Sequence, residues 1–144
     1  VILAGRRIND SMGNFISNQV IELMLQKEIE VENSHILILG LAFKENCPDL
    51  RNTRVIDIVN ELKTHNVKID IYDPWIDENS ANQEYNIDMA QELKDNTYDA
   101  IIVAVAHDVF KELGSAKIKA LGKQNCIIYD VKSMLSKDVI DGRL

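Results

Sequence analysis

Cations and carboxylates are concentrated in one segment that has the pattern of a connection between a strand and a helix. Residues 36–40 read ILILG, an apolar run that ends at a glycine, and a helical pattern begins near Thr53. Lys44, Arg51 and Arg54 follow the run, up to the first turn of that helix. Ligands of open α/β sheets bind outside the carboxyl ends of the strands, and a helix N-terminus adds partial positive charge and free N–H groups. The segment therefore predicts an anion-binding loop.

A further lysine points to the same edge of the predicted sheet. Lys132 follows the last predicted strand in the sequence YDVK. It should therefore project from the same rim as Lys44, because the carboxyl ends of parallel strands meet there. Lysines and arginine on one rim of an acidic protein indicate a phosphate site. The competing interpretation concerns Arg51, which could instead form an ion pair with Asp49 or Glu45 that only fixes the loop.

Two other strand ends carry polar residues for which structural and functional roles compete. Asp73, in the sequence YDP, stands where dinucleotide-binding domains hold a ribose hydroxyl, but ahead of a turn it also suits an Asx-turn. Trp75 could stack on a base or lie partly buried under a loop. His107 could contact a ligand, and Asp108 could cap the next helix. As a general base, His107 would need a carboxylate partner that the sequence does not reveal.

Several other chemistries find no support in the residues. The first strand leads into GLAF and not into the G-x-G-x-x-G fingerprint of dinucleotide binding. Cys47 and Cys126 are too few for a metal site or a disulfide framework, and no second His or Cys stands at ligand spacing from His107. We therefore assign no catalytic residue and no metal ligand, and we expect two reduced thiols in a cytoplasmic protein.

The bulk properties fit one soluble domain of ordinary composition. The chain has 144 residues, 46% of them hydrophobic and 27% charged. Its formal net charge of -7 argues against non-specific nucleic-acid binding, which requires a basic face. No apolar run reaches the roughly 18 residues of a membrane span, and we expect no signal peptide. Because the first residue is Val1, we expect the chain to have been cut from a longer protein.

The order of the predicted elements indicates an α/β fold. A long helix over residues 1–28 should precede alternating strands and helices. The expected strands are His35–Leu39, Val67–Tyr72, Ala100–Ala106 and Cys126–Tyr129, and the expected helices between them are Thr53–Thr64, Ile87–Lys94 and Ala116–Leu121. Strands that are apolar on successive positions are typical of a parallel sheet covered on both faces. We expect a Rossmann-like, doubly wound parallel sheet preceded by a long helix, with a loosely structured tail from Ser133 to Leu144.

The motifs taken in order resemble a known family. G-x-x-[FY]-K after the first strand, an Asp and an Arg two residues apart, Y-D-P after the second strand and D-x-K after the last cover about 100 residues. This order resembles the UDP-binding domain at the carboxyl end of the UDP-glucose and GDP-mannose dehydrogenases. The spelling FKENCPDLRNTR is most similar to the branch that acts on UDP-N-acetylhexosamines, in the synthesis of Vi antigen, O-antigen and related surface or capsule polysaccharides.

The resemblance implies roles for particular residues. Phe43, Lys44 and Lys132 should contact the UDP-sugar, and Arg51 should reach the NAD bound on another domain. Family members oxidise the C6 alcohol of the sugar to a carboxylate in two hydride transfers to NAD. The dinucleotide-binding half and the G-G-S-C-x-x-K-D stretch with the catalytic cysteine are absent from these 144 residues, so this chain alone should not be active.

The resemblance also implies a division of the chain. Residues 1–30 should be the end of a central helix that connects two domains and contributes to a homodimer, and residues 31–144 should be the UDP-sugar-binding domain. From the residues alone, the first helix could equally pack only on its own sheet. A different class also remains open, a stand-alone nucleotide- or anion-binding regulatory module, and the reading frame upstream of Val1 would separate it from an enzyme part.

Overall fold

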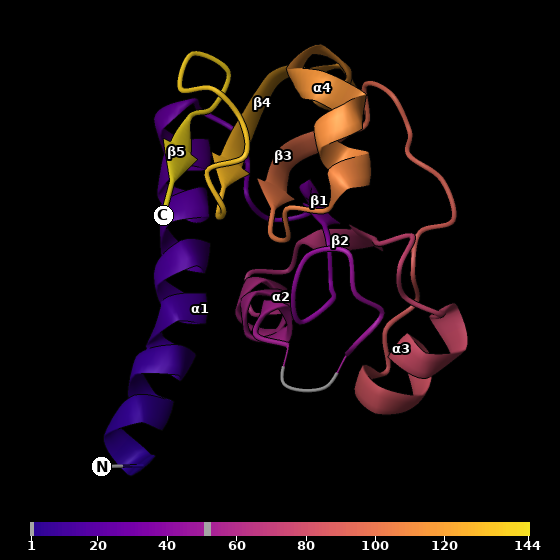
Figure 1. The fold of residues 1–144 in the computed structure, drawn as a ribbon. Helices are drawn as coiled ribbons and strands as arrows, with labels where there is room; N and C mark the ends of the chain where they lie inside the picture. Colours follow the sequence, from indigo (N-terminus) through magenta and orange to yellow (C-terminus); the bar gives the residue numbers. More distant parts are fainter. Residues whose placement is uncertain (1, 51–52) are drawn as a thin grey trace.

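Helices and strands alternate along most of the chain. The computed structural model describes residues 2–50 and 53–144. The elements are, in order, α1 (Ile2–Gln26), β1 (His35–Leu39), α2 (Val55–Lys63), β2 (Lys68–Tyr72), α3 (Glu78–Tyr85), β3 (Tyr98–Val103), α4 (Asp108–Leu121), β4 (Gly122–Asp130) and β5 (Gly142–Arg143). The expected α/β fold and the long first helix are confirmed (Figure 1). Among the described residues, no helix is long and apolar enough to cross a membrane.

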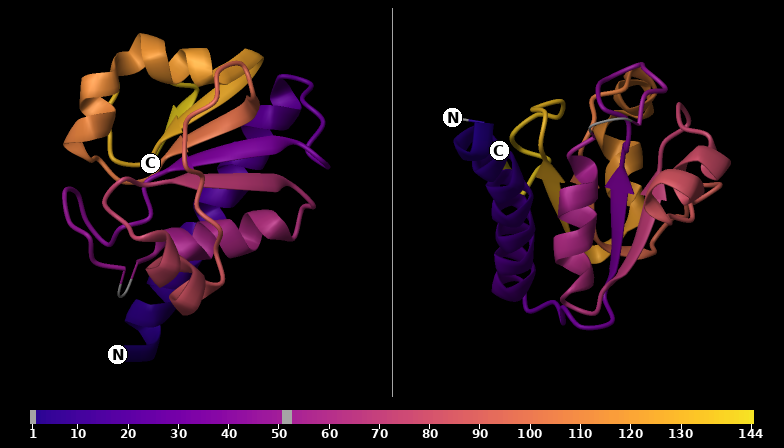
Figure 2. Two further views of the ribbon diagram at one scale, coloured as in Figure 1. Left: turned by 90° about the vertical axis from the view of Figure 1, so that its right-hand side faces the viewer. Right: turned by 90° about the horizontal axis from the view of Figure 1, so that it is seen from below.

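The strands form one parallel sheet in the order β2-β1-β3-β4-β5. Successive residues of β1 enter opposite cores, with Ile36 and Ile38 in one hydrophobic cluster and Leu37 and Leu39 in the other. Helices α1 and α2 cover the first face, and α4 covers the second (Figure 2). This two-sided cover explains why the strands are apolar on successive positions. The strand order reverses between β1 and β3, which is the position where ligands bind in such sheets.

One predicted helix is wrong. Residues 87–94 are not helical, and the helix of this region is α3, which lies earlier in the chain. The Asp77 side chain caps the start of α3 by accepting the Ser80 N–H at 3.2 Å, and Asn86, with φ of 56°, ends it. The chain then runs along β2, where the Ala90 N–H donates to the Ile71 carbonyl at 2.8 Å. The buried apolar residues of this stretch, Ile87 and Met89, therefore pack from a segment that is not helical.

The carboxyl end of the chain is also more ordered than expected. Residues Gly142 and Arg143 form β5, which pairs in parallel with Tyr129 and Asp130 of β4. The Asp141 side chain accepts the Ile128 N–H at 2.8 Å and forms an ion pair with Lys27 at 2.9 Å. The predicted loose tail therefore adds a short edge strand and ties the sheet to the segment after α1.

Close packing between α1 and α2 fixes the first helix against the domain. Gly13 of α1 faces Asp57 of α2 so closely that an added Cβ would lie 2.6 Å from the Asp57 Cβ. Ser17, one turn later, donates from its Oγ to the Gly13 carbonyl at 2.9 Å and lies 3.4 Å from the Ile58 carbonyl. The Tyr129 hydroxyl reaches the Gln19 side chain from β4. Gly13, which weakens an isolated helix, is thus explained by this helix crossing.

Replacing Gly13 with Ala should destabilise the chain even though Ala is the better helix former. The helix propensity gain is about 1 kcal/mol, whereas crowding at a packed contact costs about 1–3 kcal/mol. The added methyl would also lie 3.1 Å from the Asp57 backbone carbon, which cannot move aside cheaply. We expect a net loss of about 1 kcal/mol in urea unfolding. Asn14→Ala, at an exposed neighbouring position, is the control and should be neutral or stabilising; a Gly13→Ala variant as stable as this control would contradict the packing argument.

Candidate active-site half at the carboxyl edge of the sheet

The loops that follow β1, β2, β3 and β4 meet at the carboxyl edge of the sheet. Gly40 begins the first loop, with φ of 102° and its N–H donated to the Tyr72 carbonyl at 2.9 Å. The Leu39 carbonyl accepts the N–H groups of Ala104 and Val105, at 2.9 and 3.3 Å. An added Cβ at Gly40 would lie 2.6 Å from the Val105 Cβ. The glycine at the end of β1 is therefore required by the close approach of two loops.

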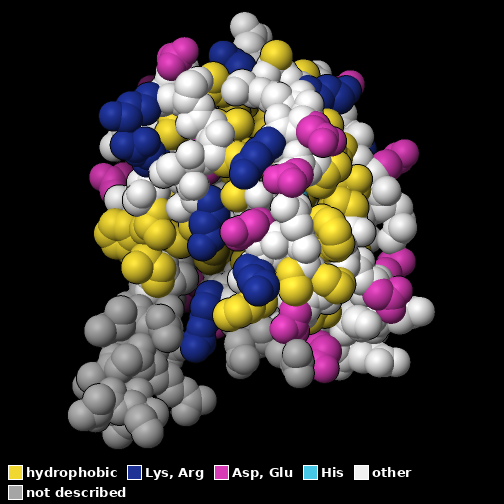
Figure 3. All heavy atoms as spheres, viewed as in Figure 1, with side chains coloured by type: hydrophobic (Ala, Val, Ile, Leu, Met, Phe, Trp, Pro, Cys, Tyr) yellow, Lys and Arg dark blue, Asp and Glu magenta, His cyan; other side chains and the backbone are white. Residues whose placement is uncertain are grey.

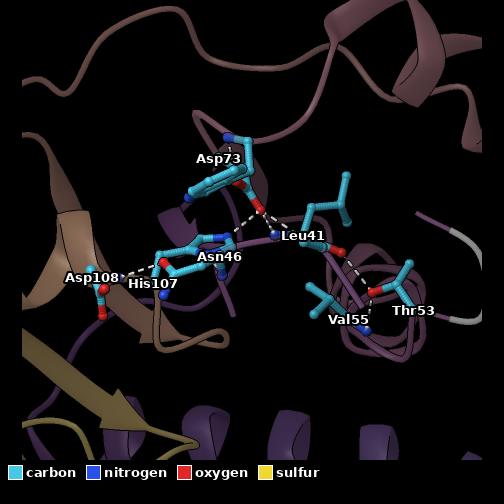
Figure 4. A network of polar contacts seen from close by, with 9 residues as sticks. Leu41, Asn46, Thr53, Val55, Asp73, His107 and Asp108 are labelled. Carbon is cyan, nitrogen blue, oxygen red and sulfur yellow. Dashed lines mark hydrogen bonds and ion pairs between the residues drawn. The ribbon is translucent and has the colours of Figure 1, made fainter. Parts of the chain in front are cut away.

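Asp73 is a buried structural carboxylate at the end of β2. Its Oδ1 accepts the Trp75 N–H at 2.9 Å, which is the expected Asx-turn. Its Oδ2 accepts the N–H groups of Leu41 and Ala42, at 2.7 and 2.9 Å, and lies 2.9 Å from His107 Nε2 (Figure 4). Burial raises the pKa of Asp73, but the hydrogen bonds from His107 and from the three backbone N–H groups lower it more, so that its pKa lies below the ordinary value.

This carboxylate also explains why the first loop of the sheet is not available to a dinucleotide. In a dinucleotide-binding domain, the backbone after the first strand approaches a pyrophosphate, and the acidic residue after the second strand holds a ribose. Here the N–H groups of Leu41 and Ala42 are donated to Asp73 itself. The carboxylate that these N–H groups contact belongs to the protein, and the Asp73 side chain is fully buried, so it is not exposed to a ribose hydroxyl.

His107 is a second buried residue of this network. Its carboxylate partner, which the sequence alone did not identify, is Asp73. The side chain is fully buried, with Nε2 bonded to Asp73 and Nδ1 accepting the Asn46 N–H at 2.8 Å. Since Nδ1 is an acceptor, the ring proton lies on Nε2 and is donated to the carboxylate. A ring with both nitrogens engaged and no exposed surface is poorly placed to abstract a proton from a ligand. The expectation that Asp108 caps the next helix is wrong, since His107 is the N-cap of α4 and Asp108 is its first residue.

A pocket of about 360 Å³ opens beside this network, between α1 and the loops at the carboxyl edge. It is lined by residues of α1, of the N-terminal end of α2 and of the loops after β1, β3 and β4. Those that matter for a ligand are Phe43, Arg54 and Lys132, with Met12 and Val105 among the apolar walls. The pocket therefore combines apolar walls with two cationic side chains, a pairing that suits a ligand with a charged and a less polar part.

The predicted site residues are placed as follows. Phe43 and Lys132 line the pocket, and the Phe43 side chain is 53% exposed. Lys44 is exposed on the loop beside Phe43 but is not part of the pocket lining. Arg51 lies outside the described residues. Arg54 is the N-cap of α2, and its guanidinium lies 3.8 Å from an Asp57 oxygen. Sequence reasoning placed Arg54 in the anion-binding loop but gave it no role of its own.

Charged side chains and the two cysteines bear on the chemistry of the domain as a whole. Although the net charge is -7, several Lys and Arg side chains lie along the middle of the face viewed in Figure 3, with Asp and Glu side chains between them. Cys47 and Cys126 are both free thiols. Burial, reinforced by Asp141, raises the pKa of the Cys126 thiol to about 12, so Cys126 is not a thiolate at neutral pH. Within the described part of the chain, no group of three or more His, Cys, Asp or Glu residues could hold a metal ion.

The parallel sheet and the pocket at its carboxyl edge together define a Rossmann-like domain with a candidate ligand site at that edge. The chain belongs to the UDP-glucose/GDP-mannose dehydrogenase family, because the model of that family's UDP binding domain matches residues 37–137. The resemblance seen in the motifs is thereby confirmed.

Relatives with known names agree with this membership. The chain is 52% identical over its whole length to a UDP-N-acetyl-D-glucosamine 6-dehydrogenase of Salmonella typhi and 46% identical to one of Pseudomonas aeruginosa. It is 38% identical over 98% of its length to protein CapL of Staphylococcus aureus. The chain covers 34%, 34% and 33% of these three proteins, so it spans about a third of their length.

Solved structures share the fold. A UDP-D-ManNAc dehydrogenase of Pyrococcus horikoshii matches 96% of the chain with a TM-score of 0.76 at 24% identity, and the match covers 31% of that protein. An NDP-N-acetyl-D-galactosaminuronic acid dehydrogenase of Methanosarcina mazei matches 94% of the chain with a TM-score of 0.82 at 21% identity, over 28% of that protein. At these identities the likeness concerns the fold, and it includes α1 as well as the sheet.

Proposed function

We propose that this chain is the nucleotide-sugar-binding part of an NAD-dependent UDP-N-acetylhexosamine 6-dehydrogenase of surface polysaccharide synthesis in the cytoplasm. The observation that carries the proposal is the 52% identity, over the full chain, to a UDP-N-acetyl-D-glucosamine 6-dehydrogenase. The pocket at the carboxyl edge supports it, because cationic side chains beside apolar walls suit a diphosphate joined to less polar groups. The complete enzyme would oxidise the sugar C6 alcohol to a carboxylate in two hydride transfers.

We assign the residues as follows. Lys132 binds the nucleotide from the pocket, Phe43 packs against the sugar or the base, and Lys44 approaches the sugar or its phosphates from the same loop. Arg51 reaches NAD, most of whose contacts come from a domain outside these 144 residues. The hydrogen bonds from Leu41 and Ala42 to Asp73 agree with this assignment. These N–H groups are not available to NAD, so that NAD binding is left to another domain.

The first helix supports the proposed division into residues 1–30 and 31–144. Met12, Phe15 and Leu25 of α1 are 40%, 49% and 60% exposed although they are large and apolar. Apolar residues exposed together on one element are typical of a surface that another domain or subunit covers. We propose that α1 joins this domain to an N-terminal domain of the same polypeptide and contributes to a homodimer.

The activity is tested with the product of the complete reading frame that contains this sequence. Incubation with NAD and each UDP-N-acetylhexosamine should yield two NADH for each sugar oxidised and a UDP-N-acetylhexosaminuronic acid as product. NADH formation can be followed by absorbance and the acid by mass spectrometry. UDP binding without any NAD reduction, or a reading frame that lacks a second domain, would instead favour a stand-alone nucleotide-binding module.

Removing the pocket lysine should weaken nucleotide binding without unfolding the domain. Lys132 is exposed, so Lys132→Ala should leave the unfolding midpoint nearly unchanged. A hydrogen bond between charged groups contributes about 1.5–3 kcal/mol, which corresponds to roughly 10- to 100-fold in affinity. Calorimetric titration with UDP should show that loss. Lys137→Ala, an exposed lysine five positions further on, changes the net charge equally and is the control; equal losses in both variants would mean that only general electrostatics is involved.

A further inference from the structure

The loop that carries Phe43 and Lys44 is closed on itself at its base. The Phe43 N–H donates to the Asp49 carbonyl at 2.8 Å, so that residues 43–49 form a small closed loop. The two side chains assigned to the ligand, Phe43 and Lys44, are exposed on it. Their positions therefore depend on what holds this loop against the body of the domain.

Asn46, at the far end of the loop, makes reciprocal hydrogen bonds with the start of α4. Its backbone N–H donates to His107 Nδ1 at 2.8 Å, and its Oδ1 accepts the Asp108 N–H at 2.9 Å. Within the described residues, the N-cap residue of α4, His107, makes no capping hydrogen bond with its own side chain. Asn46 thus caps α4 from a different loop. Its φ of 55° is a left-handed conformation that asparagine adopts more readily than most residues.

His107 links this loop to the interior of the domain. The side chain is fully buried, and its ring lies 5.3 Å from the Phe110 ring and 6.2 Å from the Trp75 ring. Its Nε2 is held by Asp73, which also holds Leu41 and Ala42 at the start of the same connection (Figure 4). These contacts hold the ring in one orientation, with Nδ1 directed at the Asn46 N–H.

We propose that His107 and Asn46 form a clasp that positions residues 43–49, and with them Phe43 and Lys44, for the nucleotide sugar. The proposal rests on the proposed function of the pocket, and it makes His107 and Asn46 positioning residues that need not touch the ligand. A loop that is already ordered loses less conformational freedom on binding, so the clasp should raise affinity. Nδ1 of His107 then positions the ligand-binding loop through Asn46, while Nε2 stabilises the fold through its bond to Asp73.

Two substitutions of His107 separate the two halves of the ring. In His107→Asn, the amide oxygen can take the place of Nδ1 and keep the acceptor for Asn46, while the contact with Asp73 is lost. In His107→Gln, the longer amide can keep the donor to Asp73, while the acceptor for Asn46 is lost. His107→Asn gives up a hydrogen bond to a buried carboxylate, whereas His107→Gln gives up one from a neutral N–H, so His107→Asn should be the less stable variant. If His107 only stabilised the fold, amide exchange would therefore be faster in His107→Asn, which is the opposite order to the one that the clasp predicts.

The first readout needs no ligand. Amide hydrogen exchange should be about tenfold faster at Asn46 and Phe43 in His107→Gln than in His107→Asn, because only the Gln variant frees the loop. The second readout is the UDP dissociation constant of the same proteins, which should be about tenfold higher for His107→Gln if the binding-competent loop falls to about a tenth of the population. Equal exchange in the two variants would overturn the clasp.

A surface variant guards against a failure of the His107 variants to fold. Asn46→Gly keeps the left-handed conformation and the N–H to His107 but removes the side-chain cap of α4. It should speed loop exchange and weaken UDP binding in the same sense as His107→Gln. Asn33→Gly is the matched control, since Asn33 is also exposed and has φ of 65°, but its N–H donates to the Asn66 carbonyl at the other end of the sheet.

The outcomes distinguish the clasp from the proposed function. If wild-type protein binds no UDP, the assignment of the pocket fails, and the exchange data still decide whether the clasp orders the loop. If wild-type protein binds UDP and loop exchange responds as expected, but affinity does not change, then the clasp does not position the ligand-binding residues and the proposal is overturned.

Discussion

Replacing Asp73 with Asn should lower the free energy of unfolding by about 3 kcal/mol at neutral pH, because removing one member of a buried charged network leaves its partners unsatisfied. The carboxylate accepts hydrogen bonds through both oxygens, from Trp75 on one side and from Leu41, Ala42 and His107 on the other. An amide can accept only through its oxygen, so its NH2 group must face one set of donors. Urea unfolding of both proteins measures the loss.

The pH dependence of this loss follows from the lowered pKa of Asp73. A carboxyl whose pKa is lower in the folded state than in the unfolded state stabilises the fold above its unfolded pKa of about 3.9. That contribution is lost as the pH falls through the native pKa. The stability gap between the wild type and Asp73→Asn should therefore be constant near neutral pH and close below about pH 4.

The control for Asp73→Asn is Asp77→Asn, four residues away. Asp77 is exposed and caps α3, and Asn is an equally good N-cap, so this substitution should change stability by less than about 0.5 kcal/mol. A gap between wild type and Asp73→Asn that stayed constant into the acid range would show that the loss comes from packing and not from the carboxylate charge.

The second large effect is expected at Gly40. Its φ of 102° is strained for any residue with a Cβ, and the added methyl would lie 2.6 Å from the Val105 Cβ and 3.0 Å from the Val105 backbone nitrogen. Backbone strain of about 1–3 kcal/mol and overpacking of similar size should add. We expect Gly40→Ala to lose about 4 kcal/mol of stability or to fail to accumulate as folded protein.

Gly114 offers a matched control for this substitution. Its φ of 80° is also left-handed, but nothing lies within 4 Å of an added Cβ, so Gly114→Ala should suffer the strain without the overpacking. The difference between the two variants in urea unfolding then measures the close approach of the loops after β1 and β3. Equal losses of stability in Gly40→Ala and Gly114→Ala would show that the domain accommodates the added methyl beside Val105 without cost.

Much of the fold was predictable because its signals are local. The apolar run that ends at Gly40 predicted β1 as His35–Leu39, and the structure has these bounds. The false helix at residues 87–94 has a physical cause. Its apolar residues are spaced as in a helix, but they pack from a non-helical segment that bonds to β2 through Ala90. The caps of α3, Asp77 and Asn86, were the local signals that would have found the true helix.

The sequence predicted a site residue only where the position of that residue after a strand end was enough to suggest a role. Lys132 and Phe43 follow strand ends, and the structure brings both to the same pocket. Asp73 and His107 are 34 positions apart, and the link between them depends on β2 and β3 flanking β1 in the sheet. No spacing in the sequence shows that arrangement. The reciprocal bonds of Asn46 with the start of α4, 62 residues away, are of the same kind.

The most direct test of the pocket assignment is a titration of the 144-residue chain with UDP and, separately, with NAD, followed by amide chemical shifts. We predict that UDP shifts the amides of Phe43, Lys44 and Lys132, and that NAD leaves them unchanged because the N–H groups of Leu41 and Ala42 are already donated to Asp73. Shifts produced by NAD around Leu41, Ala42 and Asp73, with those of Phe43 and Lys132 silent to UDP, would contradict the assignment of this pocket to the nucleotide sugar.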